Sequence, residues 1–519
     1  MMPIQCHAVT MKRIRHVALA TSPLLLLAAG CDDAADSAGK IPVAEAAASD
    51  HRAVPAQPER KPESEPAAEV EAEGEAIERS EPRQLHLPGP TLAGWKPTFN
   101  GHTELDEPPE GFTHLAVVTG RQVGLYTNPG DRWPSGIART GNRIPARVAD
   151  EGGSGCSGGT WYEVTGDGYL CSSQGVHMIE ERFTDEDFSE VTTALQRTRK
   201  PRSDQPNLFR HGVAKDGAPF LKALPSEEEL EAIRNGDLPE HLVNLYANGA
   251  YVLAFTDEID VHGETYFQTI YGSYIREADV MHRPLSPMHG EWLSEGDDRL
   301  PLAFSWRPTE LYCLDGEIAT PCGTVAKHAR FSADDTVEKE GREFVRLGDR
   351  LAVPREDVRL AKSIARPSSY GTDDKWIHID LTEQVMLAYE GDTPIFATLI
   401  SSGREGFHTP TGSYRIDRMY NSKTMRGTGG DGRPYQVQEV PWALYYDGNY
   451  AAHGAYWHNN FGQPQSHGCV NIPPLDSRWL FHWSDDLQVP QGWHAVKHRT
   501  GTRIHVTGET PPPAEEERA

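Results

Sequence analysis

The sequence predicts a mainly β protein, in which a disordered linker and small β modules precede a C-terminal β-sandwich. Three separate segments, around residues 161–171, 266–276 and 344–353, share an apolar pair, a glycine turn and a second short β-prone run. That pattern is typical of a β-hairpin. Residues 376–389 carry two alternating runs about a Thr-Glu-Gln turn, which also indicates a hairpin. One short stretch, residues 227–234, indicates a helix, so we expect strands to dominate.

Residues 1–30 have the features of a secretory signal peptide. From Met11, the expected start, a basic stretch precedes the largely apolar residues 17–27, and small residues lead to Cys31. The apolar run is too short to cross a bilayer as a stable helix. The Ala-Ala-Gly-Cys order resembles a bacterial lipobox, which implies that Cys31 is acylated and tethers the mature protein to a membrane. An ordinary signal peptide with a free Cys31 is the alternative.

Residues 31–88 are expected to form a disordered linker. They are rich in Ala, Glu and Pro and nearly free of aromatic residues, so they cannot bury enough apolar area to offset the chain entropy lost on folding. The Pro- and Glu-rich residues 509–519 form a similar tail. The chain of 519 residues has a formal net charge of −26. Such acidity argues against nucleic-acid binding and against an electrostatic hold on anionic lipid.

The seven cysteines support an exported protein. Cys6 and Cys31 fall in the processed or anchoring region, and Cys469 stands alone. The other four form two local pairs, which in an exported chain indicate small loops closed by disulfides: Cys156 with Cys171, and Cys313 with Cys322. A free cysteine beside paired ones is the arrangement that a thiol enzyme needs in an oxidising compartment.

The three hairpin segments resemble bacterial SH3-like domains, which are small β-barrels. The resemblance implies modules at residues 89–180 and 205–285 and, more weakly, at residues 300–362. Ser226 and Glu229 can form a capping box at the start of the helix expected in the second module. Four aromatic residues of these hairpins fit either a hydrophobic core or a groove for a glycan or peptide: Trp161, Tyr169, Tyr266 and Tyr274.

Residues 373–508 are expected to form the C-terminal β-sandwich. After the hairpin described above, residues 393–402 indicate a strand, and a Thr-Pro-Thr-Gly turn leads into another strand at residues 413–418. Arg415 and Arg418 fit equally well a surface position and a role in holding a substrate carboxylate.

The most informative stretch joins a histidine to a cysteine sixteen positions later through a turn of small residues: His453, then Ser466-His467-Gly468-Cys469-Val470-Asn471. A cysteine acts as an acyl-transfer nucleophile when a base withdraws its proton and backbone N–H groups face the developing oxyanion. Gly468 lets the backbone turn tightly before the cysteine. A small buried structural cysteine is the alternative interpretation of a lone Cys469.

A zinc site is the rival at the same residues. Four side chains there are of zinc-binding type: His453, His458, His467 and Cys469. However, one residue separates the last two, whereas two or more residues usually lie between paired zinc ligands.

The stretch resembles the signature of the YkuD-type L,D-transpeptidases, a histidine followed by Ser/Thr-His-Gly-Cys-x-Asn. A Ser-Ser-Gly and Thr-Pro-Thr-Gly order extends the resemblance over residues 376–506. The resemblance implies a YkuD-like β-sandwich in which Cys469 is the nucleophile and His453 is the general base, held by a backbone carbonyl such as that of Gly454.

The resemblance also implies how the turn around the nucleophile works. The amides of His467, Gly468 and Cys469 would form the oxyanion hole, and Ser466 and Asn471 would hold the turn. Four aromatic residues lie where the family places its substrate-covering loop, although core packing explains some of them equally well: Tyr435, Trp442, Tyr445 and Tyr446.

The activity implied by the resemblance is peptidoglycan L,D-transpeptidation in the bacterial cell envelope. Cys469 would attack the amide before the terminal D-alanine of a stem tetrapeptide, and a side-chain amine of a neighbouring stem would accept the acyl group in a 3→3 cross-link. No metal or organic cofactor is implied. The expected partners are peptidoglycan stem peptides and, through Cys31, a membrane.

Other functions remain open for the same site. Water as acceptor would give an L,D-carboxypeptidase, and an envelope protein as acceptor would give attachment to the wall. A wall-binding lipoprotein whose catalytic domain no longer turns over is the alternative from another class. The intact motif from His453 to Asn471 argues against that alternative.

Overall fold

The computed structural model describes residues 85–87, 110–149, 154–180, 207, 209–248, 251–282, 284–293, 299–428, 434–484, 489–490, 492–497 and 501–512. The predicted signal peptide, Cys31 and nearly all of the predicted linker lie outside these residues, as do residues 513–519 of the predicted tail. Within the described residues, no helix combines the length and the apolar character needed to cross a membrane.

Strands dominate the structure, which confirms the mainly β prediction. All four predicted hairpins are present as antiparallel pairs: β6–β7, β13–β14, β22–β23 and β25–β26. Among the described residues the α-helices are α2 (Glu227–Arg234) and α3 (Pro474–Trp483). At the start of α2, Ser226 and Glu229 form the predicted capping box. The second helix, α3, was not predicted.

The first module is defined here as residues 110–180. Its five-stranded sheet has the order β7-β6-β5-β2-β8, and a separate hairpin joins β3 to β4. A disulfide links Cys156 to Cys171. The strands are β2 (His114–Val118), β3 (Gln122–Leu125), β4 (Gly136–Arg139), β5 (Arg143–Val148), β6 (Trp161–Val164), β7 (Gly168–Cys171) and β8 (Val176–Glu180).

The second module, residues 209–282, packs antiparallel strands around its own apolar cluster, which includes Phe220, Phe255 and Phe267. Helix α2 lies in this module and buries Leu230. The strands are β9 (Arg210–Ala214), β10 (Pro219–Leu221), β11 (Val243–Tyr246), β12 (Tyr251–Val261), β13 (Glu264–Thr269), β14 (Tyr274–Arg276) and β15 (Val280–His282).

The third module, residues 299–361, contains two sheets and the Cys313–Cys322 disulfide. Strand β1 (Leu85–Leu87), from the predicted linker, pairs in parallel with β19 at its edge. The other strands are β17 (Leu302–Ser305), β18 (Thr309–Asp315), β19 (Ile318–Val325), β20 (Arg330–Ser332), β21 (Thr336–Lys339), β22 (Arg342–Leu347), β23 (Leu351–Pro354) and β24 (Val358–Ala361). The resemblance of the modules to SH3-like barrels stays a prediction.

The C-terminal domain stacks two sheets around one core. One sheet has the order β16-β27-β26-β25-β34-β28: β16 (Glu291–Trp292), β25 (Lys375–Asp380), β26 (Val385–Glu390), β27 (Thr393–Leu399), β28 (Gly412–Arg415) and β34 (Arg503–Thr507). The other contains β29 (Arg418–Thr428), β30 (Pro434–Asp447), β31 (Tyr450–Gly454), β32 (Val470–Ile472) and β33 (Ala495–Lys497). Helix α3 packs on β30 and β31.

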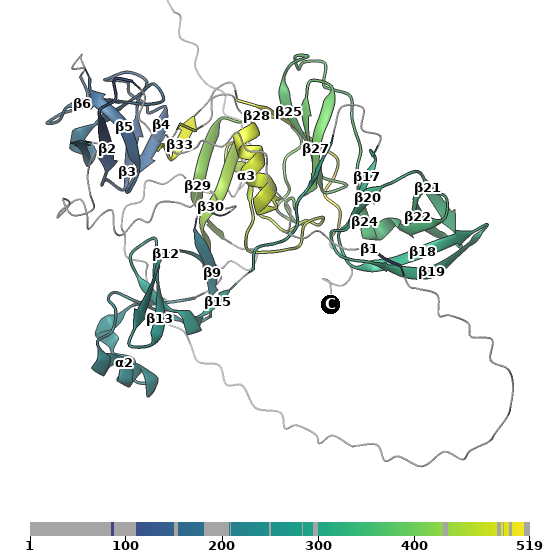
Figure 1. Cartoon of the computed structure of the whole chain (residues 1–519), viewed down its shortest axis with the longest axis horizontal. Coiled ribbons are helices and arrows are strands. Elements are labelled where there is room, and N and C mark those ends of the chain that lie inside the picture. The colour runs from purple at the N-terminus through teal and green to yellow at the C-terminus, as the bar shows by residue number, and fades with distance from the viewer. Residues whose placement is uncertain are drawn as a thin grey trace, which may run out of the picture.

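Two modules share a sheet with the C-terminal domain. Strand β12 of the second module pairs in parallel with β30, and β4 of the first module pairs antiparallel with β33. The resulting 14-stranded sheet runs from the second module through β30, β29 and β33 to the first. Figure 1 shows this arrangement, with β33 beside β4 and with β9 and β12 below β30. The first and second modules are therefore joined to the C-terminal domain by strand pairing.

Trp493 closes the contact with the first module. Its indole N–H donates a hydrogen bond of 2.9 Å to the carbonyl of Thr165, and the ring is 4% exposed. A Cβ added at Gly136 or at Gly168 would lie 2.4 Å from this ring. These two positions need glycine because a larger side chain would displace the indole.

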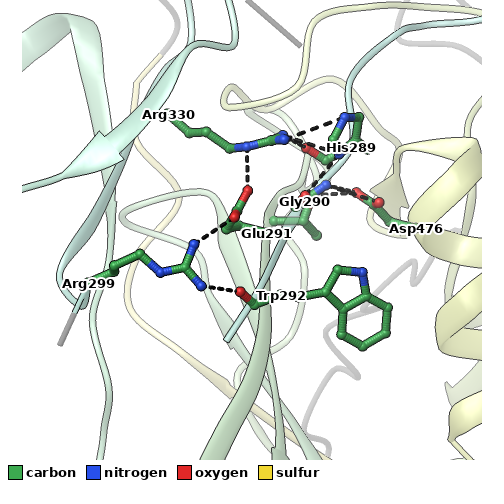
Figure 2. A network of polar contacts seen from close by, with 8 residues as sticks. His289, Gly290, Glu291, Trp292, Arg299, Arg330 and Asp476 are labelled. Carbon is green, nitrogen blue, oxygen red and sulfur yellow. Dashed lines mark hydrogen bonds and ion pairs between the residues drawn. The ribbon is translucent and has the colours of Figure 1, made fainter. Parts of the chain in front are cut away.

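The segment before the third module is tied to α3 by buried polar contacts (Figure 2). Both carboxylate oxygens of Asp476 accept from the Gly290 N–H, at 2.9 and 3.0 Å, and one also accepts from the Thr398 hydroxyl at 2.6 Å. Arg330 donates to the carbonyl of His289 at 2.8 Å. Strand β16, which follows Gly290 directly, thereby adds to the edge of the C-terminal sheet beside β27.

Candidate active site

The residues of the sequence motif meet on two neighbouring parallel strands. Strand β31 carries His453, and Cys469 immediately precedes β32. The register pairs Ala452 with Val470 and His453 with Asn471. Because paired residues and residues two apart point to the same face of a sheet, His453 and Cys469 lie on one face. Their Cα atoms are about 8 Å apart, from a strand spacing of ~4.8 Å and a two-residue offset of ~6.6 Å.

His453 is buried and neutral. Burial lowers the pKa of His453 to about 4, and the hydrogen bond to the Gly454 carbonyl offsets this only in part. Its Nδ1 lies 3.2 Å from that carbonyl oxygen, which can only accept, so Nδ1 carries the proton. The tautomer leaves a lone pair on Nε2. This is the form that can accept a proton from a thiol.

Cys469 is partly exposed, and among the cysteines that the structure describes it is the one outside a disulfide. Its Sγ lies 3.8 Å from the carbonyl oxygen of Asn449. Tyr446 is buried close to Cys469. Burial, and secondly the charge of a Cys469 thiolate, raise the pKa of the Tyr446 phenol well above its usual range. The candidate nucleophile is therefore accessible to solvent on one side and packs against an apolar cluster, which includes Tyr420 and Tyr445, on the other.

The turn before Cys469 is fixed by short-range hydrogen bonds. Gly468 has φ +112°, in a region that favours glycine, and an added Cβ would lie 2.6 Å from the Tyr450 ring. Its carbonyl accepts from the Thr409 hydroxyl at 2.9 Å, and that hydroxyl accepts from the Gly403 N–H at 2.9 Å. Thr409 of the Thr-Pro-Thr-Gly segment thus stabilises the turn. The sequence did not predict this contact.

Ser466 holds the turn from within. Its hydroxyl donates to the Cys469 carbonyl and accepts from the Gly468 N–H at 3.0 Å. Of the three amides predicted to form an oxyanion hole, the one of Gly468 is therefore already hydrogen-bonded. The amides of His467 and Cys469 are the other two donors of that prediction.

Asn471 fixes the loop that carries His458. Nδ2 of Asn471 lies 2.9 Å from Nε2 of His458, and the Asn460 N–H donates to Nδ1 at 3.2 Å. Burial lowers the pKa of His458 to about 3, so the ring is neutral. Both ring nitrogens are then used, which leaves His458 unsuited as the zinc ligand considered from the sequence.

An aromatic and cationic group borders the turn. The His467 ring stacks on Tyr435 with centroids 4.6 Å apart, and Phe407 meets it edge-on at the same distance. Nη2 of Arg404 lies 3.0 Å from Nε2 of His467. Burial and the guanidinium lower the pKa of His467, so its side chain is neutral. Arg404 was missed in the sequence because nothing local places it beside a residue 63 positions later.

The other predicted residues have simpler surroundings. Arg415 donates to the Gly501 carbonyl at 3.0 Å, and Arg418 stacks over Tyr445 at 4.7 Å. The first contact ties β28 to the segment before β34, and the second joins β29 to β30. Three of the four predicted loop aromatics are buried, Trp442, Tyr445 and Tyr446, whereas Tyr435 is only partly buried and stacks on His467 in the turn before Cys469.

Residues 374–506 match the family of the YkuD L,D-transpeptidase catalytic domain. No curated protein matches the chain.

Several solved structures share similarity with this region. A mutant of the Enterococcus faecium L,D-transpeptidase is 26% identical over 26% of this chain and 50% of its own, with a TM-score of 0.21. The catalytic domain of an E. faecium L,D-transpeptidase, solved by NMR, is 26% identical over 27% of this chain and 100% of its own, with a TM-score of 0.22. L,D-transpeptidase 3 from Mycobacterium tuberculosis, in complex with a faropenem-derived adduct, is 18% identical over 32% and 77%, with a TM-score of 0.22. The chain spans about half the length of the first of these proteins.

Proposed function

We propose that this protein is a peptidoglycan L,D-transpeptidase, on the premise that residues 374–506 form a YkuD L,D-transpeptidase catalytic domain. The family match supports an acyltransferase type of enzyme acting on peptidoglycan. The observation that carries the proposal is the shared face of Cys469 and His453 on two parallel strands, with a neutral base tautomer beside a partly exposed thiol. The proposed reaction is the formation of 3→3 cross-links through a thioester.

In the acylation step, Cys469 attacks the carbonyl carbon before the terminal D-alanine of a stem tetrapeptide. The thiol proton passes to Nε2 of His453, and the carbonyl oxygen takes up the negative charge. The tetrahedral intermediate collapses, the carbon–nitrogen bond breaks, and His453 returns the proton to the departing D-alanine amine. The product is a thioester on Cys469.

Stabilisation of the oxyanion is assigned to backbone N–H groups. Donors fixed before the reaction are worth ~3 kcal/mol or more each because they need no reorganisation. We assign this role to the amides of His467 and Cys469, since Gly468 donates to Ser466. The hydrogen bonds that the Thr409 and Ser466 hydroxyls donate to the turn would hold those two amides in place.

The second step uses an amine of a neighbouring stem. Neutral His453 takes a proton from the amine as it attacks the thioester, and the thiolate of Cys469 leaves and is reprotonated. Residues of this chain supply the nucleophile, the base and the donors, so the proposal requires no cofactor. The family match favours a location in the cell envelope, and we propose export and attachment through a lipid on Cys31.

The proposal is tested by incubating the full chain with a stem tetrapeptide that ends in D-alanine, followed by mass analysis. Loss of D-alanine together with a cross-linked dimer supports transpeptidation. D-alanine loss without dimer would identify a carboxypeptidase instead. An unchanged peptide, from folded protein with Cys469 reduced, would favour the non-catalytic wall-binding alternative. Cys469→Ala is the matched control, since it removes only the sulfur.

A further inference from the structure

The long hairpin of β29 and β30 passes from the edge of the active site to a junction with both N-terminal modules. The C-terminal half of β30 pairs with β31, the strand of His453, through Leu444–Ala452 and Tyr445–Ala451. Farther back, Gln436 and Val437 of the same strand pair with β12 of the second module. Any change in the register of β30 is therefore transmitted to the catalytic histidine.

The register of this hairpin is set by a bulge that contains strained backbone. The pairing of β29 with β30 shifts between Lys423 and Met425, on either side of Thr424. Opposite it, Glu439 has φ +50°, and Trp442, three positions farther along the same strand, has φ +56°. Such values are unfavourable for a residue other than glycine, so the surrounding structure must hold them.

The carboxylate of Glu439 makes the contacts that stabilise this strained backbone. Its oxygens accept from Ser422 and, at 3.2 Å, from Thr424, which joins the two sides of the bulge. The cation is Arg139, whose Nη1 lies 2.6 Å away. The Glu439 side chain is 6% exposed and that of Arg139 is 19% exposed, so solvent screens the pair poorly. A carboxylate buried this far is costly without its cation.

Arg139 belongs to the first module, 300 positions earlier in the chain. It ends β4, and Ile137 of the same strand packs with Cys469 against one apolar cluster that includes Tyr420 and Tyr445. The second module holds the adjacent residue, because the Ala254 N–H donates to the Gln438 side chain at 3.0 Å in a buried position. The first module thus contacts Glu439 and the second module contacts Gln438, two adjacent residues of the bulge.

From these contacts we propose that Arg139 and Glu439 are positioning residues for the transfer reaction. The first module acts as a structural part of the catalytic unit: its arginine neutralises the Glu439 carboxylate and so fixes the register that places His453 on the same face as Cys469. This inference rests on the proposed function. It assigns to the module a role that the C-terminal domain cannot supply, since no residue described within residues 374–506 forms an ion pair with Glu439.

The test measures acylation of the full chain by a carbapenem, whose strained lactam carbonyl can be attacked by the thiol. Intact mass against time, at several drug concentrations, separates the maximal rate from the half-saturating concentration. Arg139→Ala and Glu439→Gln should each lower the maximal rate about tenfold or more, because small misplacements of reacting groups are costly. The double variant should be no slower than the slower single variant. Arg139→Lys, which keeps the charge, should recover most of the rate.

A matched control lies in the same module. Arg147 and Glu163, on β5 and β6, form an ion pair with Nη2 2.6 Å from the carboxylate. Arg147→Ala should leave the maximal rate within about twofold of the wild type. If Arg139→Ala is too unstable to purify, Glu439→Gln and Arg139→Lys decide the matter alone.

Three outcomes would overturn the inference. The first is a wild-type maximal rate in folded Glu439→Gln, and the second is additive losses in the double variant. The third is an equal loss in Arg147→Ala, which would show a general effect of destabilising the module. Wild-type protein that never reacts with the carbapenem would instead overturn the proposed function, and the inference with it.

Discussion

Replacing Asp476 with asparagine should change how the stability of this protein depends on pH. The carboxyl group is fully buried on α3, and burial raises the pKa of Asp476 from 3.8 to about 7 against the opposing effect of hydrogen bonds from Thr398 and Gly290. Between these two pKa values the folded state keeps a proton that the unfolded chain has lost. Stability contributed by this group is therefore full below pH 3.8 and is lost as the pH rises towards 7.

The size of the effect follows from the two pKa values. Integrating the difference in bound protons from pH 5 to pH 8 gives a loss of about 2.5 kcal/mol in the free energy of unfolding. Asparagine cannot ionise, yet its oxygen can accept from Gly290 and its amide can face the Thr398 hydroxyl. The Asp476→Asn variant should therefore lack this part of the pH dependence.

The assay is urea unfolding followed by tryptophan fluorescence, for both proteins at pH 5 and at pH 8. Trp479 lies on the same helix and packs on Phe396 and Trp292, so its emission reports on this part of the core. The wild type should lose about 2.5 kcal/mol more than Asp476→Asn between the two pH values. Parallel changes in the two proteins would refute the assignment of a raised pKa to a neutral, buried Asp476.

Three further predictions concern the site and its support. The acid limb of the acylation rate should fall near pH 4, where His453 becomes protonated and loses its free Nε2, and not near the ordinary histidine value of 6.5; a rate profile against pH measures it. Trp493→Ala should lower the free energy of unfolding by about 3–5 kcal/mol, since it leaves a cavity beside Gly136 and Gly168 and removes a hydrogen bond to Thr165. The midpoint of urea unfolding measures this loss. Mass mapping without reduction should find Cys156 linked to Cys171 and Cys313 to Cys322, with Cys469 open to alkylation; a mixed disulfide of Cys469 would contradict the assignment.

Local features of the sequence predicted the local features of the structure. The four hairpins depend on glycine or a short polar turn between β-prone runs, and α2 depends on the capping residues Ser226 and Glu229, all of which lie within a few positions. Helix α3 gave no such signal. It follows Pro473 without a side-chain cap and is buried on most of its surface, so its sequence lacks the period of an amphipathic helix.

The part that could not be predicted depends on contacts between distant segments. The buried carboxylate of Glu439 is explained by Arg139, and the parallel pairing of β12 with β30 joins segments that the sequence places in separate modules. No periodicity records such pairings. The motif itself indicated which residues meet. It did not indicate that the Gly468 N–H donates to the Ser466 hydroxyl or that the Thr409 hydroxyl donates to the Gly468 carbonyl.

The central claim is that Cys469 forms a covalent acyl intermediate with the help of His453. The most direct measurement is the intact mass of the full chain after exposure to a carbapenem, since a slow thioester keeps the opened drug bonded. We expect one added drug mass per chain, located on Cys469 by peptide mapping and absent in Cys469→Ala. It should form at least 100-fold more slowly in His453→Ala, the range expected for a lost general base. Folded, reduced wild-type protein that gains no mass, or a label that persists in Cys469→Ala, would contradict it.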